Sequence, residues 1–349
     1  MDQSDLFLKA CRRQPVPRTP VWFMRQAGRY MKEYRELRAR HSLLELCQTP
    51  ELAAQVTLQP IAKLGVDAAI IFADLLLPAQ AMGMKLEFVE GEGPALSEAV
   101  RTAEAVRKLK KVKDGELSYV GDAIRIVRRE LNGKAPVIGF SGAPFTVASY
   151  MIEGGASRNF LFTKQMMYQQ PKIWHELMGK LVEVLSDFLR SQVDAGADAL
   201  QIFDSWVGCL CPEDYRLYVL PHSQQLLRNV TSFSQKTPLI HFGTGTATLL
   251  ELMREAGGDV IGADWRIGLQ DAWQRVGHDV ALQGNLDPVV LFGPIEKIRE
   301  QVENILRAAE GRPGHIFNLG HGILPETPVE NVQAVVEMVH QFPTGAAQA

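Results

Sequence analysis

Short apolar runs recur along the chain, and each is flanked by Gly, Pro or Asp. They are rich in β-branched and aromatic residues, which is typical of buried strands. The eight runs lie at residues 20–23, 68–72, 136–140, 199–203, 238–242, 260–264, 281–285 and 315–319. We predict a strand at each of them.

Helical patterns separate these runs, with apolar residues spaced for one buried face, as between residues 173 and 188 or between 295 and 305. Strands that alternate with helices indicate a parallel sheet, and eight of them favour a closed (β/α)8 barrel over an open doubly wound sheet. The connections after the first four strands are the long ones. Because barrel chemistry lies on the loops that follow strands, we expect the first half of the chain to carry most of the site.

A weak internal repeat supports a reused αβ unit. Gly65, Gly196 and Gly257 each stand where a helix ends and a strand follows, as expected of a left-handed turn. Thr327, with Glu330 three residues later, predicts a capping box at the start of the last helix. No linker or low-complexity tract divides the chain, so we predict a single domain over residues 1–349 with a frayed tail at about 344–349.

The composition, with 46% apolar and 22% charged residues, excludes disorder, collagen and coiled coil. The first residues are acidic where a secretory leader would be basic. The longest apolar stretch, residues 68–84, is interrupted by Asp74 and Pro78 and is too short for a membrane span. We therefore expect a cytoplasmic protein, in which the four cysteines stay reduced.

The net charge of −3 argues against nucleic acid or a membrane surface as a partner. The charge is unevenly distributed, because residues 1–40 hold ten basic and four acidic groups whereas the remaining residues hold 27 and 36. A basic segment on an acidic body indicates a local anion site. A solvated amphipathic helix explains the same charges equally well.

Polar residues that directly follow the predicted strands converge on one face of such a barrel. In chain order they are Arg25, Gln26 and Arg29, then Asp74, then Ser141 to Tyr150, then Asp204 and Ser205, then Gly243 to Thr246, then Asp264, then Asn285 and Asp287, and finally His321. Each one alone is compatible with a cap or a loop hydrogen bond. As a set, two arginines, a carboxylate, a phenol and an imidazole suit a polyanionic ligand with a polar centre.

Arg25 and Arg29 are four residues apart, so they share a face if the segment is helical, while Gly28 makes a loop equally possible. Either arrangement allows bidentate hydrogen bonds to carboxylates. Asp74 has apolar neighbours on both sides, which predicts a partly buried carboxylate that needs a partner.

The segment PVWFMRQAGRY at residues 20–30 resembles the uroporphyrinogen decarboxylase family. A second family signature is matched by GFSGAPFT at 139–146 followed by YMIEG at 150–154. The likeness continues through IIFAD at 70–74, QIFDS at 201–205 and NLGHG at 318–322, so it covers nearly the whole chain.

This resemblance implies a barrel enzyme, usually a homodimer, that needs no metal or organic cofactor. It implies removal of carbon dioxide from the four acetate arms of uroporphyrinogen III, which gives coproporphyrinogen III. The substrate-binding residues that it implies are Arg25, Gln26, Ala27, Gly28, Arg29, Asp74, Tyr150, Phe203, Ser205 and His321. Among these it implies catalytic roles for Arg25, Arg29, Asp74, Tyr150 and His321, and it places Arg38 near the site.

The chemistry of the substrate agrees with these residues. Uroporphyrinogen bears eight carboxylates around four pyrrole N–H groups, so arginines are needed at its rim and one anion at its centre. Since no pyridoxal or thiamine motif is evident, protonation of a pyrrole ring carbon must create the cation that accepts electrons from the leaving carboxylate, and Asp74 would stabilise that cation. A water bound by an arginine and His321 are both candidates for the proton donor.

Two alternatives remain. Zinc-dependent methyltransferases of the same barrel superfamily need a His-x-Cys pair and a distant cysteine, whereas here Gly243 follows His241 and Phe242, and no cysteine follows Cys211. A non-catalytic tetrapyrrole carrier would keep the arginines but has no need of Asp74 and Tyr150.

Overall fold

The computed structural model describes residues 5–89 and 93–343. At its centre lies a parallel sheet in the order β1-β4-β5-β6-β7-β8-β9. The strands are β1 (Ala69–Ile70), β4 (Val137–Gly142), β5 (Ala199–Asp204), β6 (Leu239–Gly243), β7 (Val260–Gly262), β8 (Ala281–Gln283) and β9 (His315–Ile316). Seven of the eight predicted strands are thereby confirmed.

The remaining predicted strand, residues 20–23, forms a single parallel bridge between Val21 and Phe317. The Phe317 N–H donates to the Pro20 carbonyl (2.9 Å), and the Asp67 N–H donates to the Val21 carbonyl (2.8 Å). The chain at Val21 therefore lies between β9 and the residues that lead into β1, and it closes the sheet. The predicted α/β barrel is confirmed, with a first strand shortened because Pro20 has no N–H to donate and a turn begins at Met24.

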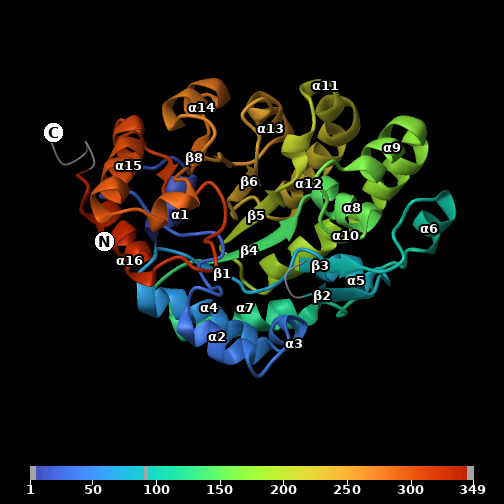
Figure 1. The fold of residues 1–349 in the computed structure, drawn as a ribbon, viewed down its shortest axis with the longest axis horizontal. Helices are drawn as coiled ribbons and strands as arrows, with labels where there is room; N and C mark the ends of the chain where they lie inside the picture. The colour runs from blue at the N-terminus through green and yellow to red at the C-terminus, as the bar shows by residue number, and fades with distance from the viewer. Residues whose placement is uncertain (1–4, 90–92, 344–349) are drawn as a thin grey trace.

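Helices surround this sheet (Figure 1), and the connections in the first half of the chain are the elaborate ones, as predicted. Before β1 lie α1 (Leu6–Cys11), α2 (Lys32–Arg38), α3 (Leu43–Gln48) and α4 (Pro50–Leu64); before β4 lie α5 (Leu77–Ala81), the antiparallel hairpin β2 (Leu86–Val89) and β3 (Gly93–Leu96), α6 (Ala103–Lys108) and α7 (Ser118–Leu131). Before β5 lie α8 (Pro144–Glu153), α9 (Leu161–Gln169) and α10 (Pro171–Asp194); before β6 lie η2 (Val207–Cys209), α11 (Pro212–Asp214), η3 (Tyr215–Val219) and α12 (Leu220–Phe233). As far as residue 343, the second half adds α13 (Leu250–Ala256), α14 (Leu269–Val276), η4 (Pro288–Phe292), α15 (Ile295–Ala308) and α16 (Val329–Gln341).

Alternate residues of the strands face the barrel interior and the helix layer. In β5, Ala199 belongs to the interior cluster, whereas Leu200 and Ile202 pack with the surrounding helices. A buried polar chain crosses the interior, in which Trp22 Nε1 donates to Gln283 Oε1 (3.0 Å) and Gln283 Nε2 donates to Gln201 Oε1 (3.0 Å). The interior is thus filled by side chains below the face at which the strands end.

Gly65 ends α4 in the predicted left-handed conformation (φ 71°, ψ 28°). Gly196 and Gly257 also have a positive φ, at 103° and 119°, but the ψ of −175° takes Gly257 out of the left-handed helical region, so the predicted turn is wrong there. The predicted capping box at Thr327 is wrong. Pro328 occupies the N-cap position with extended geometry (φ −61°, ψ 124°), so α16 starts later than the box requires and the Thr327 side chain makes no cap bond. The tail at 344–349, expected to fray, lies outside the described residues. Among the helices described, none has the length and apolar character needed to cross a membrane.

Candidate active site

Arg25 and Arg29 lie on a loop, not on a helix, because residues 24–30 form turns before α2 begins. Both side chains are exposed. Arg25 has a φ of 58°, and a Cβ on Gly28 would lie 3.1 Å from the Arg25 carbonyl oxygen. The Met24 carbonyl accepts from the Ile323 N–H (2.9 Å), so this loop is joined to the one that carries His321.

Gln26 fastens this loop to the barrel from beneath. Its side chain is buried, with Oε1 accepting from the Phe23 N–H (3.1 Å) and Nε2 donating to the Ala68 carbonyl (3.0 Å). Its own carbonyl accepts from the Tyr30 hydroxyl (2.6 Å). The structure therefore gives the Gln26 side chain a positioning role between the first strand segment and β1. The substrate contact expected of Gln26 stays a prediction.

Asp74 follows β1 and is partly buried, as its apolar neighbours predict. Its Oδ1 accepts from the Leu76 N–H (2.9 Å), and within residues 5–89 and 93–343 no donor reaches Oδ2. Burial raises the pKa of this carboxyl above its ordinary value, and the Leu76 N–H and the charge of Arg25 oppose that rise. The carboxylate therefore lies within the electrostatic reach of Arg25 and has an incomplete set of hydrogen bonds.

Tyr150 reaches the same region from α8, which begins after a single residue, Ala143, beyond β4. Its ring stacks on Trp206, with centroids 3.7 Å apart and an interplanar angle of 28°. Burial, reinforced by the Asp74 carboxylate and opposed by Arg25, raises the pKa of Tyr150 to about 12. The phenol thus stays neutral and can act as a hydrogen-bond donor.

Phe203 and Ser205 stand at the end of β5. Phe203 packs edge-on against Phe140, with centroids 5.5 Å apart, and against Phe242, with centroids 6.0 Å apart. Ser205 is partly exposed and precedes Trp206 directly. This strand end therefore supplies an apolar wall beside a hydroxyl that has no hydrogen-bond partner among the described residues.

His321 follows β9 between two glycines that allow close packing. A Cβ on Gly322 would lie 2.4 Å from Cδ of Arg25, so the arginine side chain runs directly across Gly322. Burial, together with the charges of Arg25 and Arg266, lowers the pKa of His321 to about 4, while Asp264 opposes this effect. The imidazole is therefore neutral at pH 7.

Several of the side chains gathered here have no hydrogen-bond partner within the described chain. They are the guanidinium groups of Arg25 and Arg29, the hydroxyls of Tyr150 and Ser205, and the imidazole of His321. Polar groups without internal partners beside a carboxylate with a free oxygen form a surface prepared for a polar ligand.

Other strand-end residues hold loops. Asp204 Oδ1 accepts from Thr146 Oγ1 (3.0 Å), and Asp287 Oδ1 accepts from the Val289 N–H (2.9 Å). Arg38 Nη1 donates to the His41 carbonyl (2.5 Å) at the end of α2, so its guanidinium is partly engaged. For Asp204 and Asp287 the structure shows the loop contacts that the sequence left as the alternative reading, whereas the place of Arg38 near the substrate stays a prediction.

Two residues beside the site were missed by sequence reasoning. The Trp206 ring stacks on Tyr150, and the Trp206 backbone N–H donates to Thr146 Oγ1 (3.3 Å). Arg266 acts on His321, although it lies far from it in the sequence. Each residue lies just past a strand, and that position was the signal that could have marked it as part of the site. Their partners lie on distant segments, so local sequence patterns could not identify them.

The described residues form no cluster of metal ligands. Over residues 5–89 and 93–343, no group of three or more His, Cys, Asp or Glu side chains could hold a metal ion. His241 is fully buried, and its nearest acidic group is Asp204, with Nε2 and Oδ2 3.8 Å apart. The residues described therefore do not fit the zinc site that the methyltransferase alternative requires.

The fold and this surface define a barrel enzyme in which Arg25 interacts with a carboxylate, a neutral phenol and a neutral imidazole. The family model described as Uroporphyrinogen decarboxylase (URO-D) matches residues 2–342. The uroporphyrinogen decarboxylase of Carboxydothermus hydrogenoformans is 57% identical over 340 residues, covering 97% of each chain. That of Sorangium cellulosum is 56% identical over 345 residues, covering 99% of this chain and 98% of the relative. The chain belongs to the uroporphyrinogen decarboxylase family and is therefore a carboxy-lyase.

Among solved structures, a methyltransferase from Methanosarcina mazei superposes with a TM-score of 0.79 at 21% sequence identity and covers 97% of this chain and 98% of its own. At this level of identity the likeness shows the shared barrel fold alone.

Proposed function

We propose that this chain converts the four acetate side chains of uroporphyrinogen III to methyl groups, which gives coproporphyrinogen III in tetrapyrrole biosynthesis. The observation that carries the proposal is that Arg25 and Tyr150, whose side chains have no hydrogen-bond partner among the described residues, interact electrostatically with Asp74, a carboxylate that accepts a single hydrogen bond there. Membership of the family supports the same reaction.

Substrate binding follows from charge and hydrogen bonding. Arg25 and Arg29 bind side-chain carboxylates of the macrocycle with charge-assisted hydrogen bonds. Asp74 accepts hydrogen bonds from the pyrrole N–H groups with its free oxygen. Tyr150, Ser205 and His321 orient acetate and propionate arms, while Phe203 packs against the ring system. Gln26, Ala27 and Gly28 hold the arginine loop in place.

The reaction needs a site for the electrons that decarboxylation releases. A proton adds to a pyrrole ring carbon, and the ring becomes a cation. The bond to the carboxylate carbon then breaks, carbon dioxide leaves, and the electron pair forms an exocyclic double bond that neutralises the ring. A second proton on the exocyclic carbon, with loss of the ring-carbon proton, gives the methyl group. Asp74 stabilises the cationic stage, when charge is greatest.

The protonation state of His321 bears on which group donates the proton. A pKa of about 4 keeps its imidazole neutral at pH 7, so in the free protein it serves as a hydrogen-bonding group and not as an acid. A water bound to Arg25 or Arg29 therefore fits the donor role better. We propose no organic cofactor, because the protonated pyrrole itself accepts the electrons.

The family resemblance also implies a homodimer, and the sequence itself predicts a cytoplasmic location; both belong to this proposal. The oligomeric state is tested by sedimentation equilibrium, which should give twice the chain mass of 38.8 kDa.

The defining experiment is anaerobic incubation of the protein with uroporphyrinogen III, followed by chromatography of the oxidised products. We expect stepwise loss of carboxylates from eight to four, without added metal or cofactor. Tight binding with no loss of carboxylates would indicate the carrier instead. Stoichiometric zinc together with methyl transfer would indicate the methyltransferase.

A further inference from the structure

The proposed substrate-contacting residues are unevenly spread around the barrel. They follow β9, the segment at Val21, β1, β4 and β5, which are consecutive in the closed ring. None follows β6, β7 or β8. A macrocycle with carboxylates around its whole rim would therefore direct some of them toward a sector to which no binding group is assigned.

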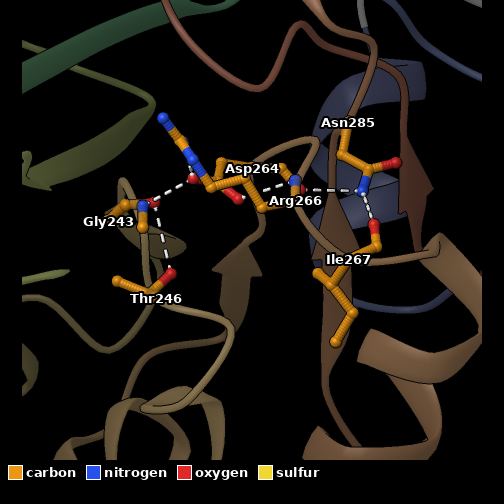
Figure 2. Close-up of polar contacts among 7 residues, drawn as sticks. Gly243, Thr246, Asp264, Arg266, Ile267 and Asn285 are labelled. Atoms are coloured by element: carbon orange, nitrogen blue, oxygen red, sulfur yellow. Dashed lines mark hydrogen bonds and ion pairs between the residues drawn. The ribbon is translucent and has the colours of Figure 1, made fainter. Parts of the chain in front are cut away.

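Arg266 is the cation in this sector, which follows β6, β7 and β8. It follows β7, which lies four strand positions from β1, and hence from Asp74, in either direction around the ring. The other polar groups past these strands bear no positive charge: the turn at 243–246 is neutral, and Asn285 donates to the Asp264 and Ile267 carbonyls (2.9 and 2.7 Å). Figure 2 shows this arrangement around Asp264.

The guanidinium of Arg266 is held in place by a buried carboxylate. Asp264 Oδ2 accepts from Arg266 Nη1 (2.5 Å) and from the Gly245 N–H (2.5 Å), while Oδ1 accepts from the Arg266 N–H (3.0 Å). The Asp264 side chain is fully buried, whereas the Arg266 side chain is 49% exposed. The ion pair therefore orients the arginine without enclosing it.

Trp265 packs against the Arg266 guanidinium and links it to the proposed site. The Arg266 guanidinium lies 4.1 Å from the centroid of the Trp265 ring. A Cβ on Gly320 would lie 2.5 Å from the Trp265 backbone nitrogen, so the segment that follows β7 packs against the residue that precedes His321. The charges of Arg266 and Arg25 act together on the His321 imidazole. Arg266 thus borders the proposed site across His321.

The guanidinium also keeps unused hydrogen-bonding capacity. Its Nη1 is bound to Asp264, and across the described residues Nε and Nη2 donate to nothing. An arginine held at one nitrogen and free at two others is oriented in advance for a second carboxylate.

We propose that Arg266 binds a side-chain carboxylate of the tetrapyrrole on the side of the barrel opposite Asp74. The proposal deepens the proposed function and rests on it. Arg266 is a specificity-determining residue, because a substrate with fewer carboxylates on that side gains less from it.

The test compares Arg266→Gln and Arg266→Lys with the wild type in steady-state decarboxylation of uroporphyrinogen III. Arg254→Gln is the matched control, since Arg254 also pairs with an aspartate (Asp279, 2.8 Å) but lies on α13. Loss of one charge-assisted bond should raise KM about tenfold with kcat nearly unchanged in Arg266→Gln. We expect Arg266→Lys to recover part of the loss and the control to match the wild type. A KM within about twofold of the control would overturn the proposal.

A second measurement uses the wild-type enzyme, so it does not depend on the folding of a variant. Phenylglyoxal modifies accessible arginines, and peptide mass mapping shows which ones uroporphyrin protects. Arg266 should be protected, whereas Arg125, on α7 and 58% exposed, should react equally with and without ligand. Equal modification of Arg266 in both conditions would contradict the proposal.

The same experiments separate the two levels of inference. If Arg25→Gln and Asp74→Asn abolish turnover while Arg266→Gln behaves as its control, only the role of Arg266 fails. If Asp74→Asn decarboxylates normally, the proposed function itself fails.

Discussion

At the scale of single residues, the proposed site depends on charges that local surroundings perturb. Burial raises the pKa of the partly buried Asp74 carboxyl, and the Leu76 N–H and the charge of Arg25 oppose this effect. Arg25 also lowers the pKa of His321 and counteracts the rise at Tyr150. One arginine therefore shifts the pKa values of a carboxyl, a phenol and an imidazole.

Asp74→Asn tests how much the Asp74 charge contributes to turnover and to the free energy of unfolding. We expect turnover to fall by about 100-fold or more, since one electrostatic group is lost.

The same variant has an effect on stability. A raised carboxyl pKa gives stability that is present below the unfolded-state pKa and is lost as pH rises through the folded-state value. The variant should therefore be more stable than the wild type at pH 7, and the difference should vanish below about pH 4. Thermal unfolding at several pH values measures this, and a less stable variant at pH 7 would contradict it.

Arg25→Gln should restore part of the basicity of His321. With one of the two arginine charges removed, the His321 pKa should rise from about 4 toward its ordinary value, although burial still holds it down. The measurement is an NMR titration of the histidine ring, with Arg125→Gln as the remote control. An unchanged titration in Arg25→Gln would show that the two groups do not interact.

At the scale of elements, the loops after the strands are held by contacts between segments distant in the sequence. Gln26 ties the arginine loop to the start of β1, Trp206 supports Tyr150 on α8, and Gly322 makes room for Arg25. The apolar runs made the strands predictable, because strand patterns are local. The support of Tyr150 by Trp206 was not predictable, since it joins the ends of two different βα units.

Gly322→Ala should displace Arg25 without unfolding the barrel. The added Cβ would lie 2.4 Å from Cδ and 2.7 Å from Cγ of Arg25, near the stem of the side chain where little movement is possible. We expect KM to rise by about tenfold as the guanidinium loses its position. Gly179→Ala, on α10 with open space around it, is the control and should keep the wild-type KM.

At the scale of the whole molecule, the barrel is closed by contacts that sequence patterns indicated only in part. The run at 20–23 was expected to be a full strand, but one bridge at Val21 and a buried ion cluster at Asp67 close the ring instead. Asp67 accepts from Nη1 and Nη2 of Arg18 (2.9 and 2.7 Å), from the Val21 N–H (2.8 Å) and from His340 Nε2 (2.9 Å). It thereby joins the start of the barrel to α16.

Asp67→Ala should weaken the whole fold. Removing one partner of a buried ion cluster costs about 3–5 kcal/mol of unfolding free energy. Burial raises the pKa of Asp67, but the bonds from His340 and Arg18 outweigh it and hold the pKa below its ordinary value. This stability is present above the unfolded-state pKa and is lost as pH falls through the folded-state value, so the variant and the wild type should converge in acid. Urea unfolding measures the effect, and Asp122→Ala, in an exposed pair with Arg125, should change little.

The most direct measurement is a crystal structure of the protein with bound coproporphyrinogen. We predict that the Asp74 carboxylate lies within hydrogen-bond distance of the pyrrole nitrogens, with Arg25 and Arg29 on peripheral carboxylates. A complex in which Asp74 points away from the macrocycle, or in which the ring nitrogens face another group, would contradict the proposed mechanism.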